Sequence, residues 1–170
     1  MSITLDQLKT FCAHDGERLT INRPFSQDSW TYATDGRMII RVPRMADVPE
    51  YDDSPKEIDA RVFAAHPITG NWFKIPDGLS DKPNKCDNCK GSGKFQCDCE
   101  NIHDCGKCDG SGNSPKETAI KVGSQFAGHL LLKRLTGLPN VEICNGKEKL
   151  SALGIRFDGG EGRLMPIKTE

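Results

Sequence analysis

Cysteine thiols are the side chains of this sequence whose type and spacing best suit a defined chemistry. Six of the eight cysteines are clustered, and four of these form two units that read C-D-N-C-K-G-S-G and C-G-K-C-D-G-S-G. Fifteen residues, Lys90 to Asp104, lie between the two CxxC pairs, a spacing typical of a four-cysteine zinc site. The glycines after each pair allow positive φ angles, so backbone amides can turn back toward the sulfur atoms. The ligands that we expect are Cys86, Cys89, Cys105 and Cys108.

Four thiolates would complete the tetrahedral shell of one Zn²⁺ and leave no coordination position for water or a substrate. The sequence therefore predicts a structural zinc site with Zn²⁺ as its cofactor.

A second group of metal-binding side chains lies between the two units. Cys97, Cys99 and His103 offer two thiolates and an imidazole, and a second zinc would need a fourth ligand. Asp98, Asp104 or a thiolate shared with the first site could supply it. The alternative is that both cysteines are spare thiols and that His103 is a solvated loop residue.

The overall composition indicates a water-soluble chain without a strong charge. The formal net charge is −1 and the pI is about 6.4, so DNA contact would need a local basic patch. No apolar run approaches the roughly 20 residues of a membrane span, and the N-terminus is too polar for a secretory signal. We therefore expect a cytoplasmic protein without membrane contact. In that compartment clustered cysteines more often bind metal than form disulfides.

Two stretches of ordinary α+β pattern lie on either side of the cysteines. Thr4 and Gln7 form a capping box at the start of a helix, and strands are expected at 29–34 and 38–42, joined by a D-G turn. A short helix could follow at 57–65.

Composition changes abruptly at residues 81–115, where large aliphatic side chains nearly vanish and folding would require metal. After this segment, Ser124 is expected to cap a helix that ends at Gly137, and three strands follow. The sequence thus predicts a discontinuous domain, 1–80 and 116–170, interrupted by a zinc-binding insertion at 81–115.

The two CxxCxGSG units resemble the cysteine-rich region of DnaJ-type co-chaperones. Four such repeats hold two zinc ions in that family, whereas this chain has two intact repeats. The resemblance covers about thirty residues and implies a zinc-held fold. It does not imply co-chaperone activity, because the chain has no J-domain signature.

The remainder of the chain resembles one domain of a bacterial sliding clamp. The resemblance rests on the A-T-D-G-hydrophobic motif within Thr31–Met38, a helix at Val122–Leu135, the strands Val141–Ile143 and Leu153–Phe157, and the closing L-M-P-I within Gly162–Ile167. It implies a single clamp-like domain with two helices on an antiparallel sheet. A single small domain of this kind fits a phage-encoded protein.

Two non-catalytic functions follow as hypotheses. The first is a zinc-binding adaptor with a clamp-like fold in DNA replication or another DNA-associated assembly. The second is a zinc-dependent peptide- or protein-binding module, as the DnaJ resemblance suggests. An enzyme is not expected, because no Ser-His-Asp order, phosphate loop or H-E-x-x-H motif occurs. A protein partner is expected, whereas DNA contact, any nucleic-acid-binding residues and self-association stay open.

Overall fold

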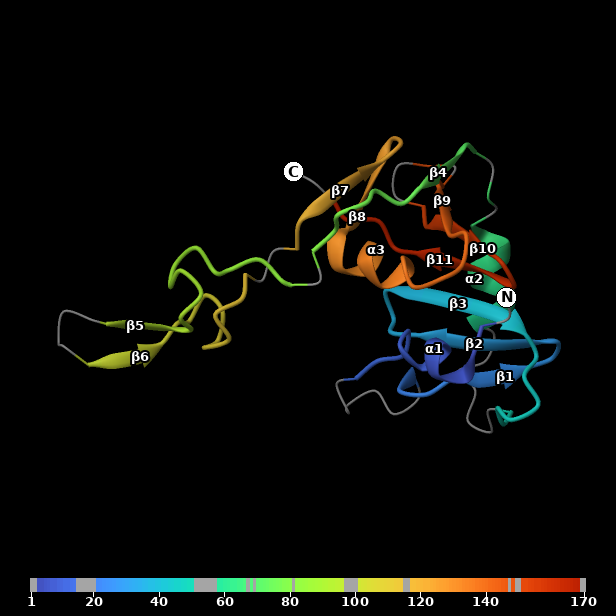
Figure 1. Cartoon of the computed structure of the whole chain (residues 1–170), viewed down its shortest axis with the longest axis horizontal. Helices are drawn as coiled ribbons and strands as arrows, with labels where there is room; N and C mark the ends of the chain where they lie inside the picture. The colour runs from blue at the N-terminus through green and yellow to red at the C-terminus, as the bar shows by residue number, and fades with distance from the viewer. Residues whose placement is uncertain are drawn as a thin grey trace.

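The computed structural model describes residues 3–14, 21–50, 58–66, 68, 70–80, 82–96, 101–114, 117–146, 148 and 151–168. It has an α+β fold, in which short helices pack on a mostly antiparallel sheet (Figure 1). None of the helices in these ranges has the length and apolar character that a membrane crossing requires.

A seven-stranded sheet organises the body, by which we mean the described residues of 1–80 and 116–170. Its order is β1-β2-β3-β11-β10-β9-β4, and every neighbouring pair is antiparallel. The strands are β1 (Phe25–Gln27), β2 (Trp30–Thr34), β3 (Met38–Pro43), β4 (Trp72–Lys74), β9 (Glu142–Cys144), β10 (Leu153–Phe157) and β11 (Gly160–Leu164). The pairs β3–β11 and β4–β9 join strands from opposite sides of residues 81–115, so both parts of the chain build one sheet.

The body contains two similar halves, each a helix followed by three strands. The helix α1 (Leu5–Lys9) precedes β1, β2 and β3, and α3 (His129–Leu135) precedes β9, β10 and β11. The last strands of the two halves, β3 and β11, pair at the centre of the sheet, with Met38 opposite Leu164. The expected capping box of α1 is confirmed, since Thr4 and Gln7 bond each other reciprocally.

Helices cover both faces of the sheet. Ile39 and Ile40 are neighbours on β3 and must point to opposite faces. Ile40 belongs to the main core with side chains of α1 and α3, whereas Ile39 packs in a second cluster with Phe63 of α2 (Ile58–Ala65). The short helix expected at 57–65 is thus confirmed as α2, and it is a third helix, covering the second face, beyond the two that the clamp resemblance implies.

The helix expected from Ser124 starts later than the sequence indicated. Residues 119–128 form a hairpin of β7 (Ala119–Val122) and β8 (Gln125–Gly128), and α3 begins only at His129. Gly123 turns this hairpin with φ +57°, and Gly128 is extended at the helix N-cap, with φ −67° and ψ 133°. The positive φ of Gly123 therefore allows a turn where apolar spacing alone suggested a helix, whereas at Gly128, whose backbone angles any residue can adopt, a Cβ would lie 2.3 Å from the Glu117 carboxylate.

The described part of residues 81–115, which we call the Cys-rich segment, extends away from the body (Figure 1). Its one hairpin in the described ranges pairs β5 (Lys94–Gln96) with β6 (Ile102–Asp104). At the base, the Asn84 side chain donates to Thr118 Oγ1 over 2.7 Å, and His129 Nε2 lies 3.2 Å from the carbonyl of Lys82. These contacts attach the segment to the start of the second half of the body.

Candidate metal centre

The Cys-rich segment brings the four expected ligands together. The Sγ atoms of Cys86, Cys89, Cys105 and Cys108 all lie within 4.8 Å of one another. Two of these separations are 3.9 Å (Cys86 to Cys105) and 3.7 Å (Cys89 to Cys108). A tetrahedron with Zn–S bonds of about 2.3 Å has edges of about 3.8 Å, whereas a disulfide would need about 2.05 Å. The spacing therefore suits four thiolates around one tetrahedral ion.

The two CxxC units are held together by a repeated set of backbone hydrogen bonds. The amide of Cys86 donates to the carbonyl of Gly112, and the amide of Cys105 donates to that of Gly93, both over 2.8 Å. Each bond thus joins the first cysteine of one unit to the last glycine of the other. This reciprocal arrangement fixes the separation of the two pairs of thiols.

Donors also point at the sulfur atoms. The amides of Gly93 and Gly112 donate to Cys89 Sγ and Cys108 Sγ, each over 3.3 Å. The side-chain amide of Asn88 donates to Cys105 Sγ over 3.3 Å. Such donors disperse the negative charge that four thiolates would bring to one site.

These donors change the acidity of the thiols unequally. The hydrogen bond from Asn88 is the largest influence on Cys105 and lowers its pKa to about 6. Burial raises the pKa of Cys108 to about 11, and the neighbouring thiols of Cys105, Cys89 and Cys86 raise it as well. Cys105 is therefore the thiol of this pair that most readily becomes a thiolate, the form that binds metal.

Close backbone packing explains why the last position of each unit requires glycine. A Cβ on Gly93 would lie 2.1 Å from the carbonyl oxygen of Gly110, and one on Gly112 would lie 2.4 Å from that of Gly91. Both residues also have φ +74°, which disfavours any side chain.

The interior of the Cys-rich segment contains little except sulfur. Among its described residues, the four cysteines form a buried cluster of their own, with 0–8% of each exposed. The large apolar side chains of the hairpin, Phe95 and Ile102, face solvent instead. Burial of apolar surface therefore contributes little to folding here, and a bound ion would have to supply the missing stabilisation.

The expected second site is described only in part. Cys97 and Cys99 lie outside the described residues, so the structure does not describe how far their thiols lie from His103. His103 lies on β6 with its ring centroid 6.0 Å from that of Phe95, and the Asp104 carboxylate forms an ion pair with Lys94. No other group of three or more metal-binding side chains gathers within the described ranges.

The two remaining described cysteines, Cys12 and Cys144, are buried in the body. Burial raises the pKa of both thiols, to about 11 for Cys12. Neither is suited to nucleophilic chemistry, which needs a thiolate.

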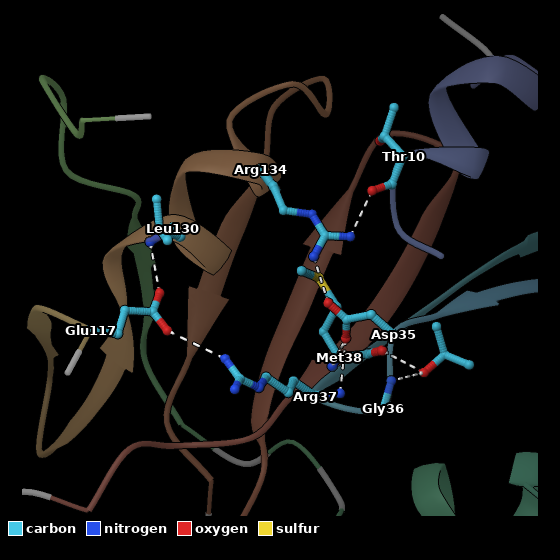
Figure 2. A network of polar contacts seen from close by, with 9 residues as sticks. Thr10, Asp35, Gly36, Arg37, Met38, Glu117, Leu130 and Arg134 are labelled. Atoms are coloured by element: carbon cyan, nitrogen blue, oxygen red, sulfur yellow. Dashed lines mark hydrogen bonds and ion pairs between the residues drawn. The ribbon is translucent and has the colours of Figure 1, made fainter. Parts of the chain in front are cut away.

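A polar network links the two halves of the body (Figure 2). Arg134 on α3 donates to the Asp35 carboxylate over 2.5 Å and to the carbonyl of Thr10 at the end of α1 over 2.6 Å. Asp35 in turn accepts from the amides of Arg37 and Met38, which closes the D-G turn. Burial would raise the pKa of Asp35, but these backbone donors and Arg134 together lower it.

The second ion pair of this network belongs to Glu117. Its carboxylate accepts from the amide of Leu130 over 2.8 Å and lies 3.7 Å from the Arg37 guanidinium. The charged groups drawn in Figure 2 thus bond one another and hold elements in place, which is a structural role.

The body also contains an apolar pocket that the sequence did not indicate. Its volume is about 330 Å³, at the small end of the range for ligand sites. Thr34, Gly36, Met38 and Met165 line it, and Val62 of α2 contributes as well. The pocket depends on contacts between distant parts of the chain, so no local sequence signal could have revealed it.

Comparison with known proteins gave no match, whether to a family model, to a curated protein or to a solved structure. The function of the chain therefore has to be inferred from its own residues and their geometry.

Proposed function

We propose that this chain is a non-catalytic zinc-binding adaptor, in which one Zn²⁺ is held by Cys86, Cys89, Cys105 and Cys108. The observation that carries the proposal is the convergence of these four sulfur atoms within 4.8 Å, with separations close to a tetrahedral edge. Zinc is favoured over harder ions because thiolate sulfur is a ligand that zinc accepts readily.

The proposed site is structural, since four protein ligands would fill the coordination shell. A catalytic zinc needs an open position for water or substrate, and these thiols are nearly inaccessible to solvent. The role of the metal is then to give shape to a projecting segment that has almost no apolar interior.

Two features of the body support a clamp-like domain in a DNA-associated assembly. The body repeats a helix and three strands, and the two terminal strands of these halves pair at its centre. Two of the stretches that carry the clamp resemblance, Thr31–Met38 and Gly162–Ile167, also lie side by side, because Met165 donates its amide to the carbonyl of Arg37. Both stretches line the apolar pocket, a surface suited to protein contact.

The face covered by α1 and α3 favours a protein partner over direct contact with duplex DNA. Lys9 of α1 pairs with Asp6, and Arg134 of α3 pairs with Asp35. Because these cations are already matched by carboxylates, they contribute little to phosphate binding. The adaptor would then join a DNA-associated assembly by binding its proteins and not by binding DNA.

A second candidate function is a zinc-dependent binder of unfolded polypeptide. The observation that favours it is the exposure of Phe95 and Ile102 on the hairpin of the Cys-rich segment. Binding to a chemically unfolded model protein, measured with and without zinc, distinguishes this candidate from an adaptor that recognises folded partners.

Metal analysis of the purified chain tests the proposal. We expect about one zinc per chain, and Cys86→Ser should abolish it, whereas Cys144→Ser should retain it because that thiol lies in the body. A chain that purifies and folds fully without metal would overturn the proposal. Two zinc ions per chain would instead support the second site that includes His103.

A further inference from the structure

We infer that Cys89 and Cys108 of the metal centre are a site of oxidative modification, at which a peroxide forms a disulfide and thereby releases the zinc ion. The inference rests on the proposed function, because it assumes that the four thiolates hold zinc. It adds a chemical means by which the metal-shaped segment could be regulated.

The four sulfur ligands fall into two pairs by their accessibility. Cys89 and Cys108, which we call the outer pair, are 8% and 7% exposed, whereas Cys86 and Cys105, the inner pair, are 1% and 0% exposed. Oxidation of a cysteine depends on its thiolate character and on its exposure. Because zinc would hold all four side chains as thiolates, exposure decides between the two pairs. A molecule as small as hydrogen peroxide therefore reaches the outer pair first.

Hydrogen bonds to sulfur do not reverse this order. The amides of Gly93 and Gly112 each donate to one outer sulfur over 3.3 Å, and the Asn88 side chain donates to Cys105 Sγ over the same distance. Such donors lower the nucleophilicity of a thiolate. Since they reach both pairs, the outer pair is not protected more strongly than Cys105, and its greater exposure leaves it more reactive.

The outer sulfur atoms are also placed to bond with each other. The Sγ atoms of Cys89 and Cys108 are 3.7 Å apart, so an approach of about 1.7 Å brings them to the length of a disulfide. The four cysteines form a buried cluster of their own, without packed aliphatic side chains around them. Little apolar packing therefore has to be disrupted when the two sulfur atoms move together.

The reaction consumes one peroxide for each disulfide. One outer thiolate attacks a peroxide oxygen, the O–O bond breaks, and a sulfenic acid and one water form. The second outer thiolate then attacks the sulfenic sulfur, the S–O bond breaks, and the remaining oxygen leaves as a second water. Two thiolates lose two electrons, the peroxide gains them, and two protons come from the solvent.

Zinc would then keep only the inner pair, whose Sγ atoms are 3.9 Å apart. Because zinc requires four ligands, two positions would open to water or to a chelator, and the ion would dissociate readily. The new disulfide joins the same two CxxC units that the metal joined, so the units stay linked after the ion leaves. Reduction of this disulfide would allow zinc to bind again, which makes the modification reversible.

The test uses the zinc-loaded wild-type chain and one equivalent of hydrogen peroxide. A chromophoric chelator reports zinc release, and mass spectrometry maps the disulfides. Trypsin places Cys89 and Cys108 in separate peptides, 86–90 and 108–116, and cleavage before Asp87 distinguishes Cys89 from Cys86.

Two control variants remove thiols outside the proposed site. Cys144→Ser removes a buried thiol of the body, and Cys97→Ser with Cys99→Ser removes the two cysteines that lie between the CxxC units in the sequence. Zinc content before oxidation verifies that each variant is loaded like the wild type.

We expect peroxide to accelerate zinc transfer to the chelator by about tenfold or more, because two ligands are lost. About one zinc should be released for each peroxide consumed, and the joined peptides should be linked through Cys89 and Cys108. Dithiothreitol with added zinc should restore the loaded form, and both control variants should behave as the wild type.

Three outcomes overturn this inference alone. They are a loaded chain that keeps its zinc under this treatment, a main product with Cys86 linked to Cys89, and a control variant that no longer releases zinc. A wild-type chain that purifies and folds without zinc overturns the proposed function itself.

Discussion

Gly93 offers a sensitive test of the metal centre, because one added methyl group meets two obstacles there. Its φ of +74° is a left-handed conformation that costs a side chain about 1–2 kcal/mol. An alanine Cβ would also lie 2.1 Å from the carbonyl oxygen of Gly110, so this carbonyl has to move. Gly110 follows Cys108 by two residues, and its displacement would disturb the geometry of that ligand.

If the segment folds only with metal, the conformational cost is subtracted directly from the free energy of zinc binding. A penalty of 1–2 kcal/mol corresponds to a factor of about 5–30, and the displaced carbonyl adds to it. We therefore expect Gly93→Ala to weaken zinc binding by more than about 30-fold. Competition against a chromophoric chelator measures this affinity.

Two other glycines serve as controls. One tests an added methyl group without positive φ or close contact, and the other tests positive φ outside the Cys-rich segment. A Cβ on Gly106 meets nothing within 4 Å and its φ is not positive, so Gly106→Ala should leave zinc affinity nearly unchanged. Gly78 has φ +75° and also meets nothing within 4 Å, but it lies outside the Cys-rich segment. Gly78→Ala should therefore cost stability without affecting zinc. Zinc affinity of Gly93→Ala within threefold of wild type would refute this reasoning, as would an equal loss in Gly106→Ala.

Three further predictions concern the ligands, their donors and the body. Cys105→Ser should release zinc and accelerate amide exchange across residues 82–96 and 101–114, while the body keeps its protection; protection retained in the segment would contradict the metal centre. Asn88→Ala removes a donor to a ligand sulfur and should weaken zinc binding about tenfold, and an unchanged affinity would mean that this bond is unimportant. Arg134→Ala should lower the free energy of unfolding by roughly 2 kcal/mol at pH 7, measured with urea. Because the folded-state pKa of Asp35 lies below its ordinary 3.8, its stabilising contribution is present above that pH and is lost as the pH falls through the lowered value. The difference between wild type and Arg134→Ala should therefore shrink in acid, and a difference that grows would contradict the role of this pair.

Local patterns predicted their parts of the structure well. The CxxC spacing brought four sulfur atoms together because each pair shares one tight turn, and the glycines supply the required positive φ angles. The D-G turn formed where Asp35 can accept from two following amides and Gly36 can take φ +85°. In each case the decisive interactions lie within a few residues of one another.

Short apolar patterns that suit either a helix or a strand were less informative. Phe126 and Leu130 suit a helix by their spacing, yet residues 125–128 pair with β7 because Gly123, with φ +57°, permits a hairpin turn there. The strand Phe25–Gln27 carries no clear alternation of its own, and it forms because it pairs with β2. Propensity is a weak prior in such short stretches, and tertiary pairing decides.

Non-local features could not be predicted at all. The donor from Asn88 to Cys105 depends on how the two units face each other, and the apolar pocket depends on the meeting of α2, the D-G turn and Met165. None of these contacts follows from a motif within one segment.

The position of the metal centre between β4 and β7 has an energetic consequence for strands that it never touches. Folding of the body has to bring together two stretches of chain separated by a long tether, and that closure costs entropy. Lys85 and Asn113 pair at the base of the Cys-rich segment, so an ordered segment leaves only a short span to close on each side. Each halving of a flexible tether recovers about 0.6 kcal/mol, and the metal should thereby raise the stability of the distant sheet by about 1 kcal/mol. Zinc supply would then set how readily this protein reaches its native state, in addition to shaping the hairpin.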